Sequence, residues 1–234
     1  MIPLRDNATI SRFLPANTLL IVANILVFGY EASLGSDSTQ LVYSYGLIPQ
    51  RVSAIGAMVA DGDLAAPFTI MSSMFLHGSF FHLAGNMLYL FIFGAAVEQN
   101  LGVVRYLMFY LLAGIAAGIA TIWMEPASTL PVVGASGAIA GVLGAYFILY
   151  PRARILTILP LVIFVEFVEV PAVIYLFLWF GVQLWEGLRA SSAENAAVGG
   201  VAWWAHVGGF LFGLAFAPLL KRRANSRCKS ASWR

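Results

Sequence analysis

Residues 103–124 read VVRYLMFYLLAGIAAGIATIWM, an apolar run of 22 residues that contains one charged side chain, Arg105. A helix of about 20 mostly apolar residues crosses the hydrocarbon core of a bilayer. Similar runs lie on both sides of this one and predict six spans, near residues 17–33, 80–98, 103–124, 136–151, 170–188 and 203–220. We therefore expect an all-α polytopic membrane protein with a six-transmembrane-helix bundle.

The composition indicates that lipid is the solvent for most of the surface. Of the 234 residues, 60% are hydrophobic and 10% are charged, and the mean hydropathy is +0.84. A water-soluble domain of this size needs more charge on its surface. We expect one membrane domain at 17–220, a cytoplasmic N-terminal segment at 1–16 and a basic cytoplasmic tail at 221–234.

Two semi-apolar segments do not fit a span. The stretch LVYSYGLIPQRVSAIGAMVA (41–60) is broken by glycine and proline, which predicts an interfacial loop after the first span. The stretch ILTILPLVIFV (155–165) is interrupted by Pro160 and holds about 11 residues before the first glutamate, too few to cross the bilayer.

The basic residues indicate how the bundle is oriented. Of the 13 Lys and Arg residues, all but Arg51 and Arg189 fall on the cytoplasmic side if both termini are cytoplasmic. The positive-inside rule supports that topology, and a compact six-span chain is typical of a bacterial cytoplasmic (inner) membrane. The basic residues flank apolar runs and form no patch, so we expect a lipid bilayer and no nucleic acid as partner.

Three predicted spans then enter from the outer face with polar residues in their first turns. His82 and Asn86 lie at the start of the second span, Ser136 opens the fourth, and His206 lies just inside the sixth. These side chains share a depth near the outer surface, so the topology makes them possible neighbours.

Competing protease chemistries lack their residues. The four aspartates (Asp6, Asp37, Asp61 and Asp63) lie outside the predicted spans, which argues against an aspartate pair that shares a proton. The three histidines form no HExxH pattern, so we expect no metal, and no cofactor is indicated. A transporter or channel would need a polar path through the full membrane depth, and the inner halves of the second, fourth and sixth predicted spans show no such path.

A serine and a histidine remain as candidate catalytic residues. A serine hydroxyl is a weak nucleophile unless a base takes its proton, and neutral histidine is the usual base. Ser136 begins a helix after the loop residue Gly134. A Ser136–His206 dyad can work without aspartate if packing holds the imidazole in place.

Small residues offer that packing. Gly137, Gly141 and Ala145 recur every four residues on the fourth span, and Gly209 and Gly213 form a GxxxG pattern on the sixth. Such faces let transmembrane helices approach closely. Since His206 precedes Gly209 by three residues, it shares that face.

The second span supplies hydrogen-bond donors. His82 and Asn86 are spaced i and i+4, and with the backbone N–H of Ser136 they are candidates to stabilise an oxyanion. Structural alternatives exist for each residue: a helix N-cap for Ser136, packing for His206, interhelical hydrogen bonding for Asn86 and an interfacial position for His82. We interpret His77 as structural.

Three segments resemble the signature motifs of the rhomboid proteases: HGSFFHLAGN (77–86), GASG (134–137) and AHVGGFLFG (205–213). The stretches MIPLRDN (1–7), TIMSSMFLHG (69–78) and VPAVIYLFLWF (170–180) are similar too, in the same order.

The resemblance implies an intramembrane serine endopeptidase that cuts single-span proteins near the outer face. It implies that Ser136 is the nucleophile, His206 the general base and acid, and His82 and Asn86 the oxyanion side chains. It also implies a water-filled site, with the fifth span and the loop before it admitting substrate laterally.

Two points stay open in the sequence. Some rhomboids carry a tyrosine four residues after the serine, which stacks on the histidine, and this chain has Ala140 there. What orients His206 is therefore not identified. The alternative function is a catalytically weak or silent rhomboid-like protein that binds client spans.

Overall fold

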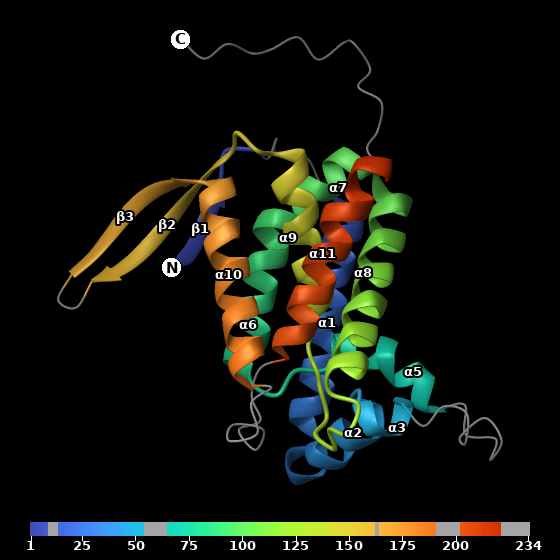
Figure 1. Cartoon of the computed structure of the whole chain (residues 1–234). Helices are drawn as coiled ribbons and strands as arrows, with labels where there is room; N and C mark the ends of the chain where they lie inside the picture. The colour runs from blue at the N-terminus through green and yellow to red at the C-terminus, as the bar shows by residue number, and fades with distance from the viewer. Residues whose placement is uncertain (9–13, 54–64, 162–163, 191–201, 221–234) are drawn as a thin grey trace, which may run out of the picture.

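The long apolar runs fold into helices, because a backbone in lipid must satisfy its own N–H and C=O groups. The computed structural model describes residues 1–8, 14–53, 65–161, 164–190 and 202–220. It is mostly helical, with long helices α1 (Pro15–Ser33), α8 (Val103–Met124), α9 (Ser136–Leu149), α10 (Ala172–Ala190) and α11 (Trp203–Leu220), as Figure 1 shows. The predicted helical membrane bundle is confirmed.

The predicted second span is a helix in three parts: α6 (Phe80–Tyr89), a π-helical turn η3 (Leu90–Gly94) and α7 (Ala95–Leu101). A π turn leaves carbonyl groups without their usual helical partners. The Leu90 carbonyl oxygen instead accepts a hydrogen bond from the Asn17 side-chain amide of α1, 3.0 Å away. Gly94 allows this approach, since a Cβ there would collide with Asn17.

Four of the described helices are long and apolar enough to cross a membrane: α1, the α6–α7 helix, α8 and α11. α9 is shorter, at 14 residues, and α10 carries Gln183, Glu186 and Arg189 in its second half. The number of spans therefore stays a prediction, as do the domain limits and the side on which the termini lie. The predicted tail at 221–234 lies outside the described residues.

Large apolar side chains on the outward faces of the helices are exposed, as a surface in contact with lipid requires. The most exposed on the long helices include Leu26, Phe91, Val104, Trp123 and Phe177. With the apolar helices, they make the chain an integral membrane protein.

Short helices form one end of the bundle. They are η1 (Gly35–Asp37), α2 (Ser38–Tyr45), α3 (Pro49–Ser53), α5 (Ala65–Ser72) and η2 (Ser73–Phe75). In the predicted interfacial loop, Leu47 pairs with Val132 of the segment before α9. Leu47, Val52 and Ala66 form a small buried cluster there, while residues 54–60 of that loop lie outside the described residues.

A three-stranded antiparallel sheet lies beside α10 at the left of Figure 1, and the sequence patterns did not predict it. Strand β2 (Arg154–Leu161) pairs with β1 (Ile2–Asp6) on one side and with β3 (Phe164–Pro171) on the other. Hydropathy indicated only that the segment before α10 is too short to cross. Strand pairing satisfies its backbone groups instead.

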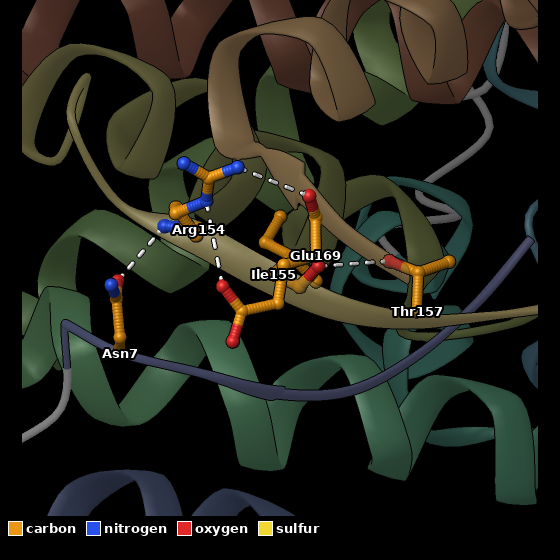
Figure 2. A network of polar contacts seen from close by, with 5 residues as sticks. All are labelled: Asn7, Arg154, Ile155, Thr157 and Glu169. Carbon is orange, nitrogen blue, oxygen red and sulfur yellow. Dashed lines mark hydrogen bonds and ion pairs between the residues drawn. The ribbon is translucent and has the colours of Figure 1, made fainter. Parts of the chain in front are cut away.

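Figure 2 shows the polar contacts at the start of this sheet. The Arg154 backbone N–H donates to Asn7 Oδ1 at 2.8 Å, which ties the N-terminal segment to β2. The Arg154 guanidinium lies 3.5 Å from a Glu169 carboxylate oxygen of β3. Because both side chains are mostly exposed, this ion pair adds little stability.

The centre of the bundle is α9, which is buried along almost its whole length. α11 and α8 pack beside it, and α10 packs against α11 on the side away from α8 (Figure 1). The N-terminal ends of α9 and α11 lie at the same end of the bundle.

Candidate active site

Ser136 and His206 are hydrogen bonded where α9 and α11 begin. Ser136 Oγ and His206 Nε2 are 2.8 Å apart, although the residues are 70 positions apart in the chain. Ala135 holds the N-cap position of α9, with no side-chain cap bond, so the serine hydroxyl does not cap the helix. His206 is 9% exposed and Ser136 is half-buried.

Glycine makes this contact possible. A Cβ at Gly209 would collide with the carbonyl oxygen of Gly137, and one at Gly213 would collide with that of Gly141. On another face of α9, a Cβ at Gly141 would collide with Ala113 of α8. The backbones of α8, α9 and α11 therefore approach more closely than side chains would allow, which brings the imidazole to the serine.

Ala140 lies in this contact, fully buried, at the position where some rhomboids carry tyrosine. A Cβ at Gly209 would lie 3.3 Å from the Cβ of Ala140, so this small side chain lies at the contact between α9 and α11. Two other aromatic rings lie beside the imidazole. Their centroids are 5.9 Å away for Trp179 of α10 and 6.3 Å away for Trp203 of α11.

The second nitrogen of the imidazole also has a partner. His206 Nδ1 and Gln183 Oε1 of α10 are 2.7 Å apart. Gln183 is 7% exposed. Ser136, His206 and Gln183 thus form a continuous chain of hydrogen bonds across three helices.

His82 and Asn86 of α6 lie against the loop that leads to Ser136. Gly134 has φ +128°, a conformation that glycine adopts without strain. A Cβ at Gly134 would lie 2.8 Å from the His82 ring and 3.6 Å from Asn86 Nδ2. The two side chains therefore face the backbone immediately before the serine. The first N–H groups of α9 have no acceptor within the helix.

His77, which we interpreted as structural, contacts this group. Its Nε2 lies 3.0 Å from Asn86 Nδ2 and accepts a hydrogen bond from that amide, and its ring lies edge-on to that of His82, with centroids 5.1 Å apart. The His77 backbone N–H donates to Glu31 Oε2 at 3.1 Å. Burial, and to a smaller extent the neighbouring His82, lower the pKa of His77 to about 4. His77 is therefore neutral at physiological pH and fixes the orientation of the Asn86 amide.

Chemically, these residues can activate a hydroxyl and stabilise an anion beside it. Ser136 Oγ has a base within hydrogen-bond distance, and amide, imidazole and backbone N–H donors gather next to it. Among the residues that the structure describes, no three His, Cys, Asp or Glu side chains lie close enough together to hold a metal ion.

Sequence reasoning missed Gln183. It is an amide in the middle of an apolar helix, and a polar residue in such a place is a signal of function or interhelical bonding. The signal was present, but its partner could be found only from the packing of α10 on α11.

Fold and site together define a class: a polytopic helical membrane protein with a hydrogen-bonded serine–histidine pair at one end of its bundle. Residues 65–223 match the family model described as "Rhomboid domain". The chain belongs to the rhomboid family.

Similar proteins come from a eukaryote and from a bacterium. The chain is 32% identical over 162 residues to "Rhomboid protein 1, mitochondrial" of Saccharomyces cerevisiae, covering 65% of this chain and 42% of that protein. It is 35% identical over 133 residues to "Rhomboid protease GluP" of Bacillus subtilis, covering 56% and 24%. It is 36% identical over 104 residues to "Putative rhomboid protease YdcA" of the same bacterium, covering 44% and 50%. The matched regions span half or less of the length of these relatives.

Proposed function

We propose that this chain is an intramembrane serine endopeptidase that cuts transmembrane segments of other membrane proteins. The observation that carries the proposal is the 2.8 Å contact between Ser136 Oγ and His206 Nε2, next to the Gly134 loop that faces His82 and Asn86. Family membership supports it, as do the relatives whose names include the word protease.

In the first half of the reaction, Ser136 Oγ attacks the carbonyl carbon of the scissile peptide while its proton moves to His206 Nε2. The tetrahedral intermediate collapses when the C–N bond breaks and His206 gives that proton to the leaving amine nitrogen. The acyl group is then an ester on Ser136.

Water completes the cycle. His206 Nε2 takes a proton from a water molecule, and the resulting hydroxide adds to the ester carbon. The second intermediate collapses as the C–Oγ bond breaks, and the proton returns from His206 to Ser136 Oγ. The enzyme is restored, and the substrate has gained one water across the peptide bond.

The negative oxygen of each intermediate needs donors in place before the reaction. His82 and Asn86 provide side-chain donors, and the backbone N–H of Ser136 provides a third at the N-terminal end of α9, where the helix dipole favours negative charge. Each such donor is typically worth about 3 kcal/mol in the transition state.

The substrates we propose are single-span proteins cut near the outer end of a span that is weakly helical and has a small residue before the cut. Both termini of this chain are then cytoplasmic, and its membrane is the bacterial cytoplasmic membrane. The distribution of Lys and Arg supports the orientation. Because one relative is named as mitochondrial, expression of the chain in cells tests the proposed membrane against a mitochondrial one.

The test is cleavage of model single-span substrates by the purified chain in detergent. Ser136→Ala and His206→Ala should each lower kcat/KM by at least about 10³-fold. The control variant Ser33→Ala, which changes an exposed serine on α1, should have no effect. Adding a metal chelator should have no effect either. Cleavage that persists in either variant contradicts the dyad. No cleavage by the unmutated chain on any substrate, together with stable capture of those spans, favours a silent rhomboid-like binding protein.

A further inference from the structure

The imidazole of His206 has one hydrogen-bond partner on each nitrogen, and the partners come from different helices. Ser136 of α9 lies at Nε2 and Gln183 of α10 lies at Nδ1, at 2.8 and 2.7 Å. The serine can donate or accept a hydrogen bond, so it does not decide which nitrogen carries the proton. The glutamine does, once the orientation of its amide is known.

Contacts within α10 indicate that orientation. The Gln183 Nε2 group faces the Trp179 carbonyl oxygen one turn earlier, 3.4 Å away, and can donate to it. If the amide were flipped, its oxygen would face that carbonyl oxygen, acceptor against acceptor. The unflipped amide therefore presents Oε1, a pure acceptor, to His206.

An acceptor at Nδ1 selects one tautomer. Only the form with hydrogen on Nδ1 can donate to Gln183 Oε1, and this form leaves the lone pair of Nε2 directed at the Ser136 hydroxyl. A general base must be in that tautomer, and the wrong tautomer in a serine–histidine site lowers the rate by orders of magnitude. Burial of Gln183 and His206 keeps water from replacing the bond.

No other polar contact to the ring is present among the residues that the structure describes. The tyrosine position of some rhomboids is Ala140, packed against α11, and the rings of Trp179 and Trp203 limit the space around the imidazole without bonding to its nitrogens. Trp179 and Trp203 thus pack against the imidazole, and Gln183 fixes the position of its proton.

We propose that Gln183 is the positioning residue of the Ser136–His206 pair: it holds His206 in the tautomer that carries hydrogen on Nδ1. The catalytic consequence of this inference rests on the proposed function. The tautomer of His206 does not depend on that function. α10 is then part of the catalytic apparatus as well as a wall of the bundle, since it completes the chain Ser136–His206–Gln183.

The test compares Gln183→Met, which keeps the size of the side chain and removes the acceptor, with Gln183→Glu, which keeps an acceptor and adds charge. For Gln183→Met we expect kcat to fall about tenfold or more with KM unchanged. For Gln183→Glu we expect measurable activity, with the acid limb of the kcat/KM profile moved to higher pH because a carboxylate favours the imidazolium. Gln50→Met, the same change at an exposed glutamine, should have no effect.

The tautomer is read directly from ¹⁵N spectra of histidine-labelled protein in micelles, with His206→Ala used to identify the signal. The unmutated chain should show hydrogen on Nδ1 of His206, and Gln183→Met should lose that preference. A wild-type kcat and an unchanged tautomer in Gln183→Met would overturn the inference, as would a change in KM alone. If Gln183→Met does not fold, an unshifted pH profile in Gln183→Glu overturns it.

The two proposals fail separately. If the unmutated chain cleaves no substrate, the proposed function fails, and the ¹⁵N spectra still decide whether Gln183 sets the tautomer. If Ser136→Ala abolishes cleavage and Gln183→Met does not reduce it, the dyad stands and the positioning role is wrong.

Discussion

Two groups of buried polar side chains lie at opposite ends of the same bundle, and they differ in what their hydrogen bonds do. At the end where α1 and α8 begin, Glu98 accepts from the backbone N–H groups of Ala16 and Asn17 at 3.1 and 2.7 Å. The Tyr106 hydroxyl donates to Asn17 Oδ1 at 2.7 Å. We call Glu98, Asn17 and Tyr106 the Glu98 cluster.

The Glu98 cluster satisfies the backbone. The Glu98 carboxylate accepts hydrogen bonds from the unpaired N–H groups at the start of α1, and the Asn17 amide donates to the π turn of the second span. These hydrogen bonds therefore join helices. At the other end, the Ser136 hydroxyl bonds to an imidazole and is half-buried. Buried polarity in a membrane protein therefore does not identify a catalytic site by itself. A hydroxyl beside an imidazole is the arrangement that the proposed reaction needs.

In this comparison of the two ends, the largest expected effect is on kcat and comes from removing the proposed oxyanion donors. His82→Ala and Asn86→Ala should each lower kcat by about 10²-fold, because each removes a donor to the developing negative charge. The thermal midpoint in detergent should change little for His82, which is half-buried. Unchanged kcat in both variants, measured at saturating substrate, would assign these residues to packing alone.

The next effect belongs to the Glu98 cluster. Glu98→Gln turns an amide NH₂ toward a backbone N–H, donor against donor, and should lower the free energy of unfolding by about 1–3 kcal/mol. Once folded, the variant should keep the wild-type kcat, because α7 and the start of α1 lie at the opposite end of the bundle from the start of α9. Reversible unfolding in mixed micelles measures the first quantity, and a kcat reduced tenfold in the folded fraction would break the comparison.

The next effect depends on pH and involves His77, and it is the smaller of the two when counted per pH unit. Its pKa of about 4 in the fold lies below the value near 6.5 of an unfolded chain. The unfolded state therefore binds more protons between these values, and stability falls as the pH drops from 6.5 to 4, by at most about 1.4 kcal/mol per pH unit. Below pH 4 this contribution levels off.

The variant His77→Gln keeps an acceptor for the Asn86 amide and removes the titration. Its thermal midpoint should depend less on pH between 4 and 6.5 than that of the unmutated chain. Equal slopes for the two proteins would show that His77 is not the group that titrates.

The smallest effect lies outside both ends, at the sheet. Arg154→Ala removes the exposed ion pair with Glu169 and should change the free energy of unfolding by less than about 1 kcal/mol. The backbone bond between Arg154 and Asn7 does not need the side chain. A loss of several kcal/mol would mean that the sheet is stabilised through its surface charges.

Much of the fold could be predicted from hydropathy, because spans are local features. The bounds of α8 and α11 agree with the predicted runs. The sheet could not be predicted, since β1 and β2 pair residues about 150 positions apart, such as Ile2 and Ile158, and an apolar count does not reveal partners.

The candidate site divides in the same way. Glycine spacing indicated that α9 and α11 could approach, which placed His206 beside Ser136 as a hypothesis. Nothing in the spacing relates Gln183 to His206, because the rotation of α10 against α11 depends on side-chain packing among three helices. The partner of His206 Nδ1 therefore follows only from the three-dimensional packing of α10 on α11.

The central claim is that His206 activates Ser136, and the most direct measurement is covalent labelling of the folded chain. A fluorophosphonate reacts with an activated serine hydroxyl and loses fluoride, which marks the residue by mass. We predict one adduct, on the peptide that contains Ser136, absent in Ser136→Ala and strongly slowed in His206→Ala. No adduct at Ser136 in folded protein, or labelling at the same rate without His206, would contradict the account.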